Sequence, residues 1–150
     1  MMANFILLLL AGPGLAAVVK YSDCGSAVGK INSVSVDPCD KAPRFCDLVK
    51  GTSPKISVTF TPNGKVESVK ADVHGIVAGI KVHFPLDQED ACQHSGLSCP
   101  LQAGKSVTYS TALPIKSEYP NVPVVVQWEL KDGQGRDLVC FRIHVKISSG

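Results

Sequence analysis

The sequence feature that most constrains the fold is a strict alternation of apolar and polar residues near the C-terminus. In LVCFRIHVKI (138–147), every second residue from Val139 to Ile147 is apolar, and the residues between them are a cysteine, an arginine, a histidine and a lysine. Successive side chains of a β-strand point to opposite faces, so this pattern predicts a strand with one apolar and one polar face. Such a strand suits an antiparallel sheet that packs one face on a core.

Further strands are predicted wherever the same alternation recurs. The candidate segments are 55–61, 66–75, 76–84, 106–111 and 123–130. Turn-forming sequences separate them, at TPNGK (61–65), around Gly75 and at KDGQGRD (131–137). The sequence shows no long amphipathic helix pattern. Seven to eight short antiparallel strands with such turns predict an all-β, immunoglobulin-like β-sandwich.

The inner faces of this sandwich would carry medium-sized side chains rather than many aromatic ones. Segment 76–84 places Ile76, Ile80, Val82 and Phe84 in phase, and the whole chain has one Trp, three Tyr and five Phe. Facing sheets normally stand ~10 Å apart with side chains filling the space. Valine and isoleucine could fill that space or line a gap left open. Composition does not decide between an ordinary core and an apolar cavity.

The N-terminal segment is typical of a secretory signal peptide. FILLLLAG (5–12) is an apolar run followed by small residues, and cleavage is expected after Ala16. The run is much shorter than the ~20 apolar residues of a membrane span; the alternative is a buried strand or helix. Residues 1–16 are therefore expected to be removed, and residues 17–150 to form one secreted domain without a transmembrane helix.

Secretion gives the six cysteines a structural meaning. An even number of cysteines in an oxidising compartment predicts disulfides, here three. Of the fifteen possible pairings, the simplest closes two small local loops and joins the two ends of the chain. That pairing is Cys39–Cys46, Cys92–Cys99 and Cys24–Cys140. Metal binding is the alternative, but zinc sites use CxxC-type spacing or nearby histidines, and six residues separate each close pair.

Motifs of catalysis and of cofactor binding are absent from the sequence. It has no GxSxG, HExxH, Walker A, GxGxxG or CxxC pattern. His74, His94 and His144 fit a turn, a disulfide loop and a solvated strand face, and only His83 adjoins an apolar run at Phe84. We therefore expect a protein that is not an enzyme and holds no metal. The formal charge of +2, with scattered basic residues, argues against nucleic-acid binding.

Several short motifs are similar to those of one family of lipid-binding proteins. They are DCGS (23–26), VHGI (73–76), HFPL (83–86), CP (99–100), LPIKSEYP (113–120) and VQWEL (126–130). Together with the six cysteines in order, these motifs resemble the ML lipid-recognition domain family. The resemblance covers the whole of the chain after the expected leader.

The resemblance implies an immunoglobulin-like sandwich whose sheets splay to hold one cholesterol, and it implies the same three disulfides. It implies a carrier of unesterified cholesterol and related sterols, secreted and present in the lumen of late endosomes and lysosomes. Such a carrier passes sterol to the Niemann–Pick type C membrane protein and is helped by anionic membrane lipids. No cofactor besides the ligand cholesterol is implied, and we expect a monomer. The alternatives are a carrier of phospholipid or fatty acid, and a secreted interaction module with a filled core.

The resemblance also implies which residues contact the sterol. The mouth of the pocket would be formed by Phe84, Ile115 and Tyr119. The walls would be formed by Val36, Val58, Val82, Leu113, Pro114, Val124, Val126, Trp128, Phe141, Ile143 and Val145. This set falls on faces that the alternation already makes apolar.

The connector LPIKSEYP poses a physical question of its own. It is too apolar for a solvent loop and too rich in proline for a central strand. If Pro114 and Pro120 stiffen it, Ile115 and Tyr119 can act as flaps over an apolar slot. The alternative is a proline-bounded crossover whose apolar residues plug the core.

Three basic groups are adjacent in sequence to the expected mouth residues. Lys81, Lys116 and a protonated His83 would bring the mouth to anionic lipid. The alternative is that these groups are ordinary solvated charges.

Overall fold

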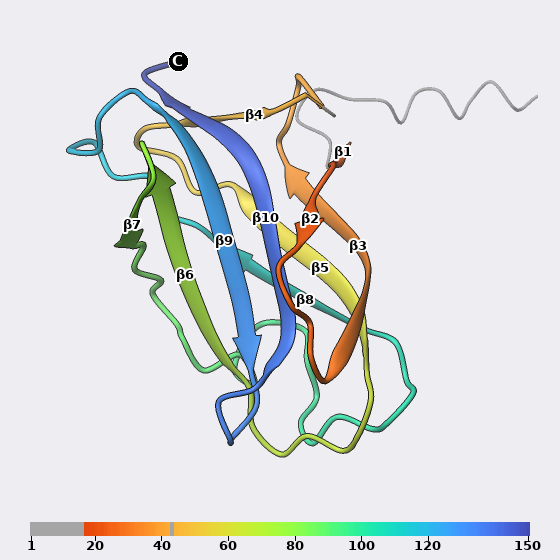
Figure 1. Ribbon diagram of the computed structural model, residues 1–150. Coiled ribbons are helices and arrows are strands. Elements are labelled where there is room, and N and C mark those ends of the chain that lie inside the picture. The colour runs from red at the N-terminus through yellow and green to blue at the C-terminus, as the bar shows by residue number, and fades with distance from the viewer. Residues whose placement is uncertain (1–16, 43) are drawn as a thin grey trace, which may run out of the picture.

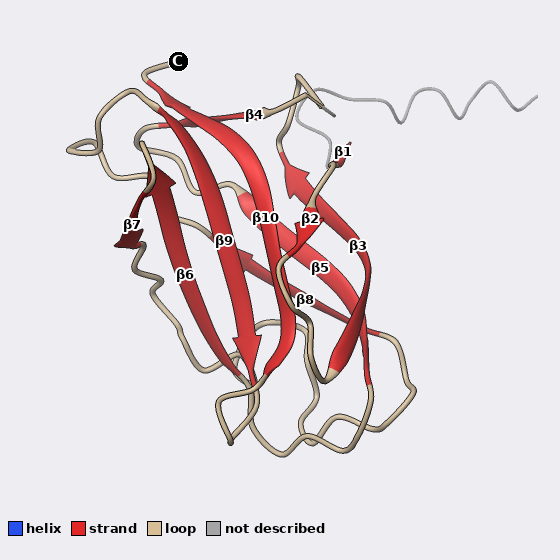
Figure 2. Cartoon of the chain, viewed as in Figure 1, coloured by secondary structure: helices blue, strands red, loops and turns tan. Residues whose placement is uncertain are grey.

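Two β-sheets stacked face to face form the body of the protein (Figure 1). The computed structural model describes residues 17–42 and 44–150, and the expected leader at 1–16 lies outside the described residues. Within the described ranges every regular element is a strand (Figure 2). Those ranges include no helix that is long and apolar enough to cross a membrane.

The described part of the chain contains ten strands in the two sheets. They are β1 (Ala17–Val18), β2 (Ser22–Asp23), β3 (Gly29–Asp37), β4 (Cys46–Val49), β5 (Lys55–Pro62), β6 (Lys70–Val77), β7 (Ile80–His83), β8 (Val107–Ala112), β9 (Pro123–Lys131) and β10 (Asp137–Ser148). The four-stranded sheet has the order β1-β3-β5-β8, and the six-stranded sheet has the order β2-β10-β9-β6-β7, with β4 also beside β10. The all-β, immunoglobulin-like sandwich expected from the sequence is confirmed.

Four of the ten strands, β1 to β4, are not predicted by the alternation; β1 and β2 have only two residues each, and the geometry of β3 and β4 explains why they were missed. In β3, the pairing with β5 shifts register between Ile31 and Ser33, so the buried residues Ile31 and Val34 are three positions apart instead of two. The short strand β4 runs parallel to β10, so the expectation of purely antiparallel pairing is wrong at this edge.

The turn expected around Gly75 is also wrong, because β6 continues through Gly75 and ends at Val77. The chain reverses two residues later, where Ala78 and Gly79 have φ of 50° and 80°. Gly79 fits this left-handed conformation at no steric cost. Gly75 instead allows close packing of β6 on β9, because a Cβ atom at this position would lie only 3.2 Å from Val124 Cγ1.

The two sheets bury one face each in a single hydrophobic cluster. On β9, Val124, Val126 and Trp128 all point inward and are at most 4% exposed. The Trp128 ring stacks parallel to that of Phe141, with ring centroids 6.3 Å apart. It also meets Tyr109 of the opposite sheet edge-on, at 6.1 Å. Contacts of this kind contribute about 0.5–1.5 kcal/mol each beyond the burial of their area.

Three disulfides join the described residues in the expected pairing. Cys24–Cys140 links the N-terminal segment to β10 across a sequence separation of 116 residues. Cys39–Cys46 and Cys92–Cys99 each close a local loop with a separation of 7 residues. The long bridge therefore restricts the unfolded chain far more than either short one.

We expect the double variant Cys24→Ala/Cys140→Ala to lose about 5 kcal/mol of unfolding free energy, and Cys92→Ala/Cys99→Ala about 2 kcal/mol, from the loop entropy alone. Urea unfolding of the two variants beside the parent protein measures this. Equal losses in the two variants would show that chain closure is not what the long bridge contributes.

Candidate functional site

A pocket opens at one end of the sandwich, between the inner face of the six-stranded sheet and the connector that follows β8. Its volume is about 430 Å³, within the range of ~300–1,000 Å³ of small-molecule sites. The lining residues are Gly75, Val77, Val82, His83, Phe84, Pro85, Lys116, Glu118, Tyr119, Pro120, Val122, Val124 and Ile147. Most of them are apolar, and the charged ones come from the connector and the end of β7.

Two aromatic rings meet at this pocket. The rings of Phe84 and Tyr119 are edge-to-face, with centroids 5.2 Å apart. Phe84 is held in place because its N–H donates to the carbonyl of Val73 on β6 at 2.8 Å. The Tyr119 hydroxyl is buried without a hydrogen-bond partner among the described residues. Burial and the nearby charge of Glu118 raise the pKa of Tyr119.

The connector is anchored at its first half only. Leu113 N–H donates to the carbonyl of Pro54, and Ile115 N–H donates to that of Thr52, at 2.9 Å each. The carbonyl of Ile115 accepts from Gly51 N–H at 2.7 Å, and the Ile115 side chain is 2% exposed. Ile115 is therefore fixed in the core and does not have the freedom expected of a flap. Tyr119 lies on the turn beyond these anchors, where its N–H donates to the carbonyl of Lys116 at 3.1 Å and its ring lines the pocket.

The structure divides the residues expected to contact a sterol into two groups. Val82, Phe84, Tyr119 and Val124 line the pocket. The others lie behind it, on the inner faces of both sheets or at the start of the connector. All of these are buried except Pro114, which is half-buried: Val36, Val58, Leu113, Pro114, Ile115, Val126, Trp128, Phe141, Ile143 and Val145.

The edge strand β7 departs from the expected burial. Ile80 and Val82 are in phase with the buried Phe84, as the alternation predicts, but they are 66% and 55% exposed. They pair with Val77 and Gly75 at the edge of the six-stranded sheet. Because β7 is the outermost strand there, neither side chain is in the core: Val82 lines the pocket, and Ile80 is exposed.

Sequence reasoning missed Tyr109, which sits at the centre of the sandwich. It lies on β8 and is 1% exposed, and burial raises the pKa of its hydroxyl. The signal was present, since Tyr109 falls on the apolar phase of the segment SVTYST. Neither its hydroxyl nor Nε1 of Trp128 has a hydrogen-bond partner of good geometry within the described ranges.

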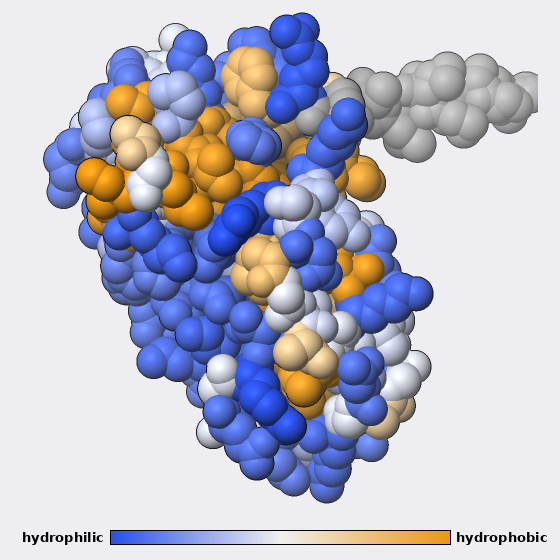
Figure 3. Space-filling view, viewed as in Figure 1, coloured by the Kyte–Doolittle hydropathy of each residue, from blue (hydrophilic) through white to orange (hydrophobic). Residues whose placement is uncertain are grey.

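A second hollow of about 530 Å³ lies on the outer face of the same end of the six-stranded sheet. Figure 3 shows apolar side chains gathered over the ends of β6, β9 and β10; further down the same view the surface is mostly hydrophilic, with smaller apolar spots. Phe45, Ile76, Val125 and Lys146 are among the lining residues, and Val124 lines this hollow and the inner pocket alike. It was not expected from the sequence, because Phe45 belongs to a loop without periodicity.

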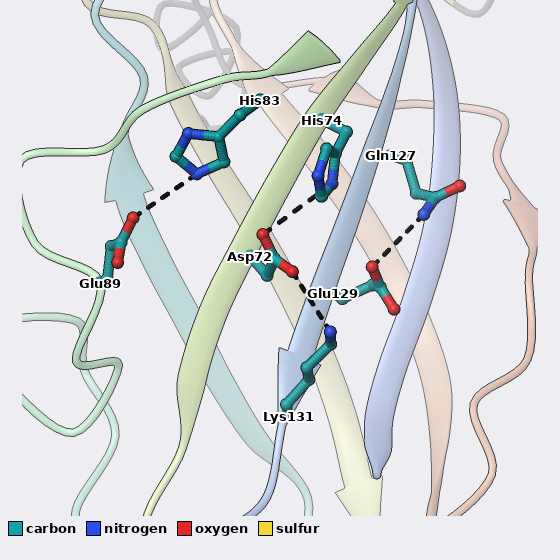
Figure 4. Close-up of polar contacts among 7 residues, drawn as sticks. All are labelled: Asp72, His74, His83, Glu89, Gln127, Glu129 and Lys131. Carbon is teal, nitrogen blue, oxygen red and sulfur yellow. Dashed lines mark hydrogen bonds and ion pairs between the residues drawn. The ribbon is translucent and has the colours of Figure 1, made fainter. Parts of the chain in front are cut away.

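Polar residues occupy the outer face below this hollow (Figure 4). Lys131 Nζ lies 3.2 Å from Asp72 Oδ2, and His74 Nδ1 lies 3.8 Å from Asp72 Oδ1. His83 Nε2 lies 3.7 Å from Glu89 Oε2. A charged His83 therefore has a carboxylate beside it, which weakens its expected part in attracting anionic lipid.

Comparisons with known proteins agree with this geometry. A family model described as the ML domain matches residues 18–147. The chain belongs to the ML domain family. It is 44% identical over 145 residues to NPC intracellular cholesterol transporter 2 of Bos taurus, covering 97% of this chain and 95% of that protein. It is 42% identical over 132 residues to NPC intracellular cholesterol transporter 2 homolog a of Drosophila melanogaster, covering 88% and 89%.

Among solved structures, this ML domain is similar to the crystal structure of a Niemann-Pick type C2 protein from Japanese carpenter ant. The TM-score is 0.80 at 27% identity, and the match covers 86% of this chain and 99% of the ant chain. The ML domain thus combines a recognised fold with an apolar pocket, and the geometry suits binding of an apolar molecule.

We expect Tyr119→Phe to leave the free energy of unfolding unchanged or to raise it by up to ~1 kcal/mol, because the hydroxyl is buried without a partner. Tyr119→Ala should lower it, because the contact with Phe84 is lost. Urea unfolding of both variants measures the difference. A clear loss of stability in Tyr119→Phe would mean that the hydroxyl makes a hydrogen bond that this geometry does not include.

Proposed function

We propose that the protein carries unesterified cholesterol and related sterols between its two sheets and releases them to membranes. One observation carries the proposal: an apolar pocket bordered by Phe84 and Tyr119 adjoins the buried inner face that includes Val126 and Trp128. The names of the ML-domain relatives support the sterol as ligand. The proposed contacts are the mouth and wall residues expected from the sequence, with Tyr119 as the moving part.

The energetics of such a site require few polar groups. Cholesterol is almost entirely hydrocarbon, and removing its surface from water at ~25 cal/mol per Å² gives on the order of 10 kcal/mol before ordering costs. Its single hydroxyl stays at the mouth beside Lys116 and Glu118, where water satisfies it. The hydrocarbon tail lies deepest. Because strands rise ~3.3 Å per residue, Trp128 lies roughly 13 Å beyond Val124 along β9.

Admission of a sterol requires movement of the gate. Val126, Trp128 and Phe141 belong to one buried hydrophobic cluster with the opposite sheet, so a rigid ring system has no room until side chains separate. Phe84 and Tyr119 part first. The two sheets then move apart, and the burial of the ligand offsets the free-energy cost of separating their side chains. Ile115, pinned to residues 51–52, stays with the core as this happens.

Release is proposed to occur at the pocket end of the sandwich. Lys116 lines the inner pocket and Lys81 is exposed on β7, and the apolar outer hollow lies on the other face of the same sheet. This end can rest on an anionic membrane, or on the Niemann–Pick type C membrane protein, while the sterol slides across without contacting water. The monomer would act in this way in late endosomes and lysosomes, secreted by means of residues 1–16.

The second candidate function, an interaction module with a filled core, is favoured by the complete burial of Val126, Trp128 and Phe141. Solvent extraction of the purified protein followed by mass spectrometry separates the candidates. A carrier yields a sterol, or a phospholipid or fatty acid if the ligand class is different, whereas an interaction module yields none in stoichiometric amount.

We expect Gly75→Val to abolish sterol binding while the protein stays folded. The backbone of Gly75 is in an ordinary strand conformation, and its added side chain would meet Val124 Cγ1 at 3.2 Å and Phe84 Cδ2 at 3.5 Å. The pocket would thus be plugged at a cost of about 1–3 kcal/mol in stability. Binding of a fluorescent sterol is measured by energy transfer from Trp128, the one tryptophan of the chain.

Gly64→Val is the matched control, because nothing lies within 4 Å of a Cβ atom at Gly64. It should bind like the parent protein. If a folded Gly75→Val variant binds sterol as well as Gly64→Val does, the ligand does not use this pocket.

We further expect Lys116→Ala and Lys81→Ala to slow sterol transfer to vesicles that contain anionic phospholipid and to leave transfer to neutral vesicles unchanged. The physical reason is attraction of about 1 kcal/mol for each basic residue near an anionic surface. Lys105→Ala is the control, because Lys105 does not line the pocket and instead lies near Gly96 and Gln102, before the start of β8. Unchanged rates in both mouth variants would remove these lysines from the docking step.

A further inference from the structure

Carboxylates from three strands gather on the outer face of the six-stranded sheet. In the register of the sheet, Asp72 of β6 is opposite Glu129 of β9, and Glu129 is opposite Cys140 of β10. Figure 4 shows Asp72, Glu129 and Lys131 on this face. The row lies directly behind the buried wall of the pocket, because Trp128 and Glu129 are neighbours on β9 that point to opposite faces.

A third carboxylate, Asp137, joins this row through an irregularity at the start of β10. Asp137 pairs with Lys131, but the register shifts between Asp137 and Val139. As a result, a carboxylate oxygen of Asp137, a carboxylate oxygen of Glu129 and Sγ of Cys140 all lie within 4.8 Å of one another. Oδ1 of Asp137 is buried and has no hydrogen-bond partner within the described ranges.

The cations around this pair are directed to other partners. Lys131 Nζ lies 3.2 Å from Asp72 Oδ2. Arg136 pairs with Asp132 at 2.9 Å, and Arg142 Nε donates to Gln127 Oε1 at 2.9 Å. The other titratable or charged groups on β2, β6, β9, β10 and the turn between β9 and β10 are Asp23, Lys70, Asp72, His74, Lys131, Asp132, Arg136, Arg142, His144 and Lys146.

We propose that Asp137, beside the carboxylate of Glu129, holds a proton in acid solution and that this proton makes the folded protein more stable at acid than at neutral pH. Two partly buried carboxyl groups at this separation cannot both ionise without strong repulsion, whereas one proton between them converts repulsion into a hydrogen bond. The inference concerns folding alone and does not depend on what the pocket binds.

The direction in which pH changes the free energy of unfolding follows from whether Asp137 is protonated in the folded and in the unfolded chain. Burial and the neighbouring carboxylate of Glu129 raise the pKa of Asp137 from 3.8 to about 7. Between these two values the folded chain holds a proton that the unfolded chain has lost. The contribution to stability is therefore complete below about pH 4 and is lost as the pH rises toward 7. The positive charge of Lys131 lowers the pKa of Asp137, but burial and Glu129 outweigh it.

The experiment is thermal unfolding of the full chain at pH 5 and pH 7.5. We expect the parent protein to unfold a few degrees higher at pH 5. Asp137→Asn keeps the hydrogen bond without a charge, so it should raise the midpoint at pH 7.5 and remove most of the difference. Glu129→Gln should do the same. Asp132→Asn is the control: its stability falls because Arg136 loses its partner, but its pH difference should persist.

Carboxyl-carbon NMR of the parent protein gives a second, direct readout. Asp137 should titrate close to neutral pH, and Glu129→Gln should move its midpoint downward. A midpoint for Asp137 near its ordinary value, or a pH difference in Asp137→Asn as large as that of the parent, would overturn the proposal. The NMR titration of the parent needs no variant to fold.

Discussion

Each strand of the six-stranded sheet contributes side chains to two surfaces, the buried inner face and the outer face, because successive side chains point to opposite sides. On β9, Val124, Val126 and Trp128 face the core, and Val124 also lines the pocket, whereas Gln127 and Glu129 on either side of Trp128 belong to the outer face. The inner set must stay apolar for the two sheets to pack, and a sterol needs an apolar wall as well. The same requirement therefore produces both the stability of the fold and its suitability as a carrier.

The pocket exists because the sandwich is closed at its centre and left open at one end. At the centre, Trp128 touches Phe141 beside it and Tyr109 across the gap. At the open end no large strand covers the inner face, and the connector with Tyr119 takes that place. Its first half is held by backbone hydrogen bonds to residues 51–54, and its second half is a turn that carries one aromatic ring. This division distinguishes a hydrogen-bonded first half from the turn that carries Tyr119, the residue we propose as the gate.

Much of this could be predicted from the sequence where periodicity is regular. Both β9 and β10 begin and end within one residue of the predicted segments 123–130 and 138–147, and the apolar phase of each is buried as predicted. Periodicity fails in β3, where a bulge displaces the buried residues, and in β6, where Gly75 looks like a turn but allows close packing inside a strand. The burial of a residue on an edge strand cannot be predicted from the alternation alone. Val82 has the apolar phase, but it is exposed because β7 is the last strand of its sheet.

Features made by distant segments were beyond sequence reasoning. The outer hollow requires Phe45, from a loop, to lie over β9 and β10. The contact of Glu129 with Asp137 requires the register shift at the start of β10. The pairing of the cysteines, by contrast, was predicted as the simplest of the possible pairings and was also implied by the resemblance to the ML domain family, and the apolar inner face was predicted from the phase of the alternation.

The most direct measurement of the central claim is an experimental structure of the protein with cholesterol bound at one equivalent. The account predicts one sterol between the sheets, its ring system between Tyr119 and Val126, its tail at Trp128 and Phe141, and its hydroxyl at the mouth. A sterol in the outer hollow beside Phe45 and Ile76, with the sheets as close together as before, would contradict it.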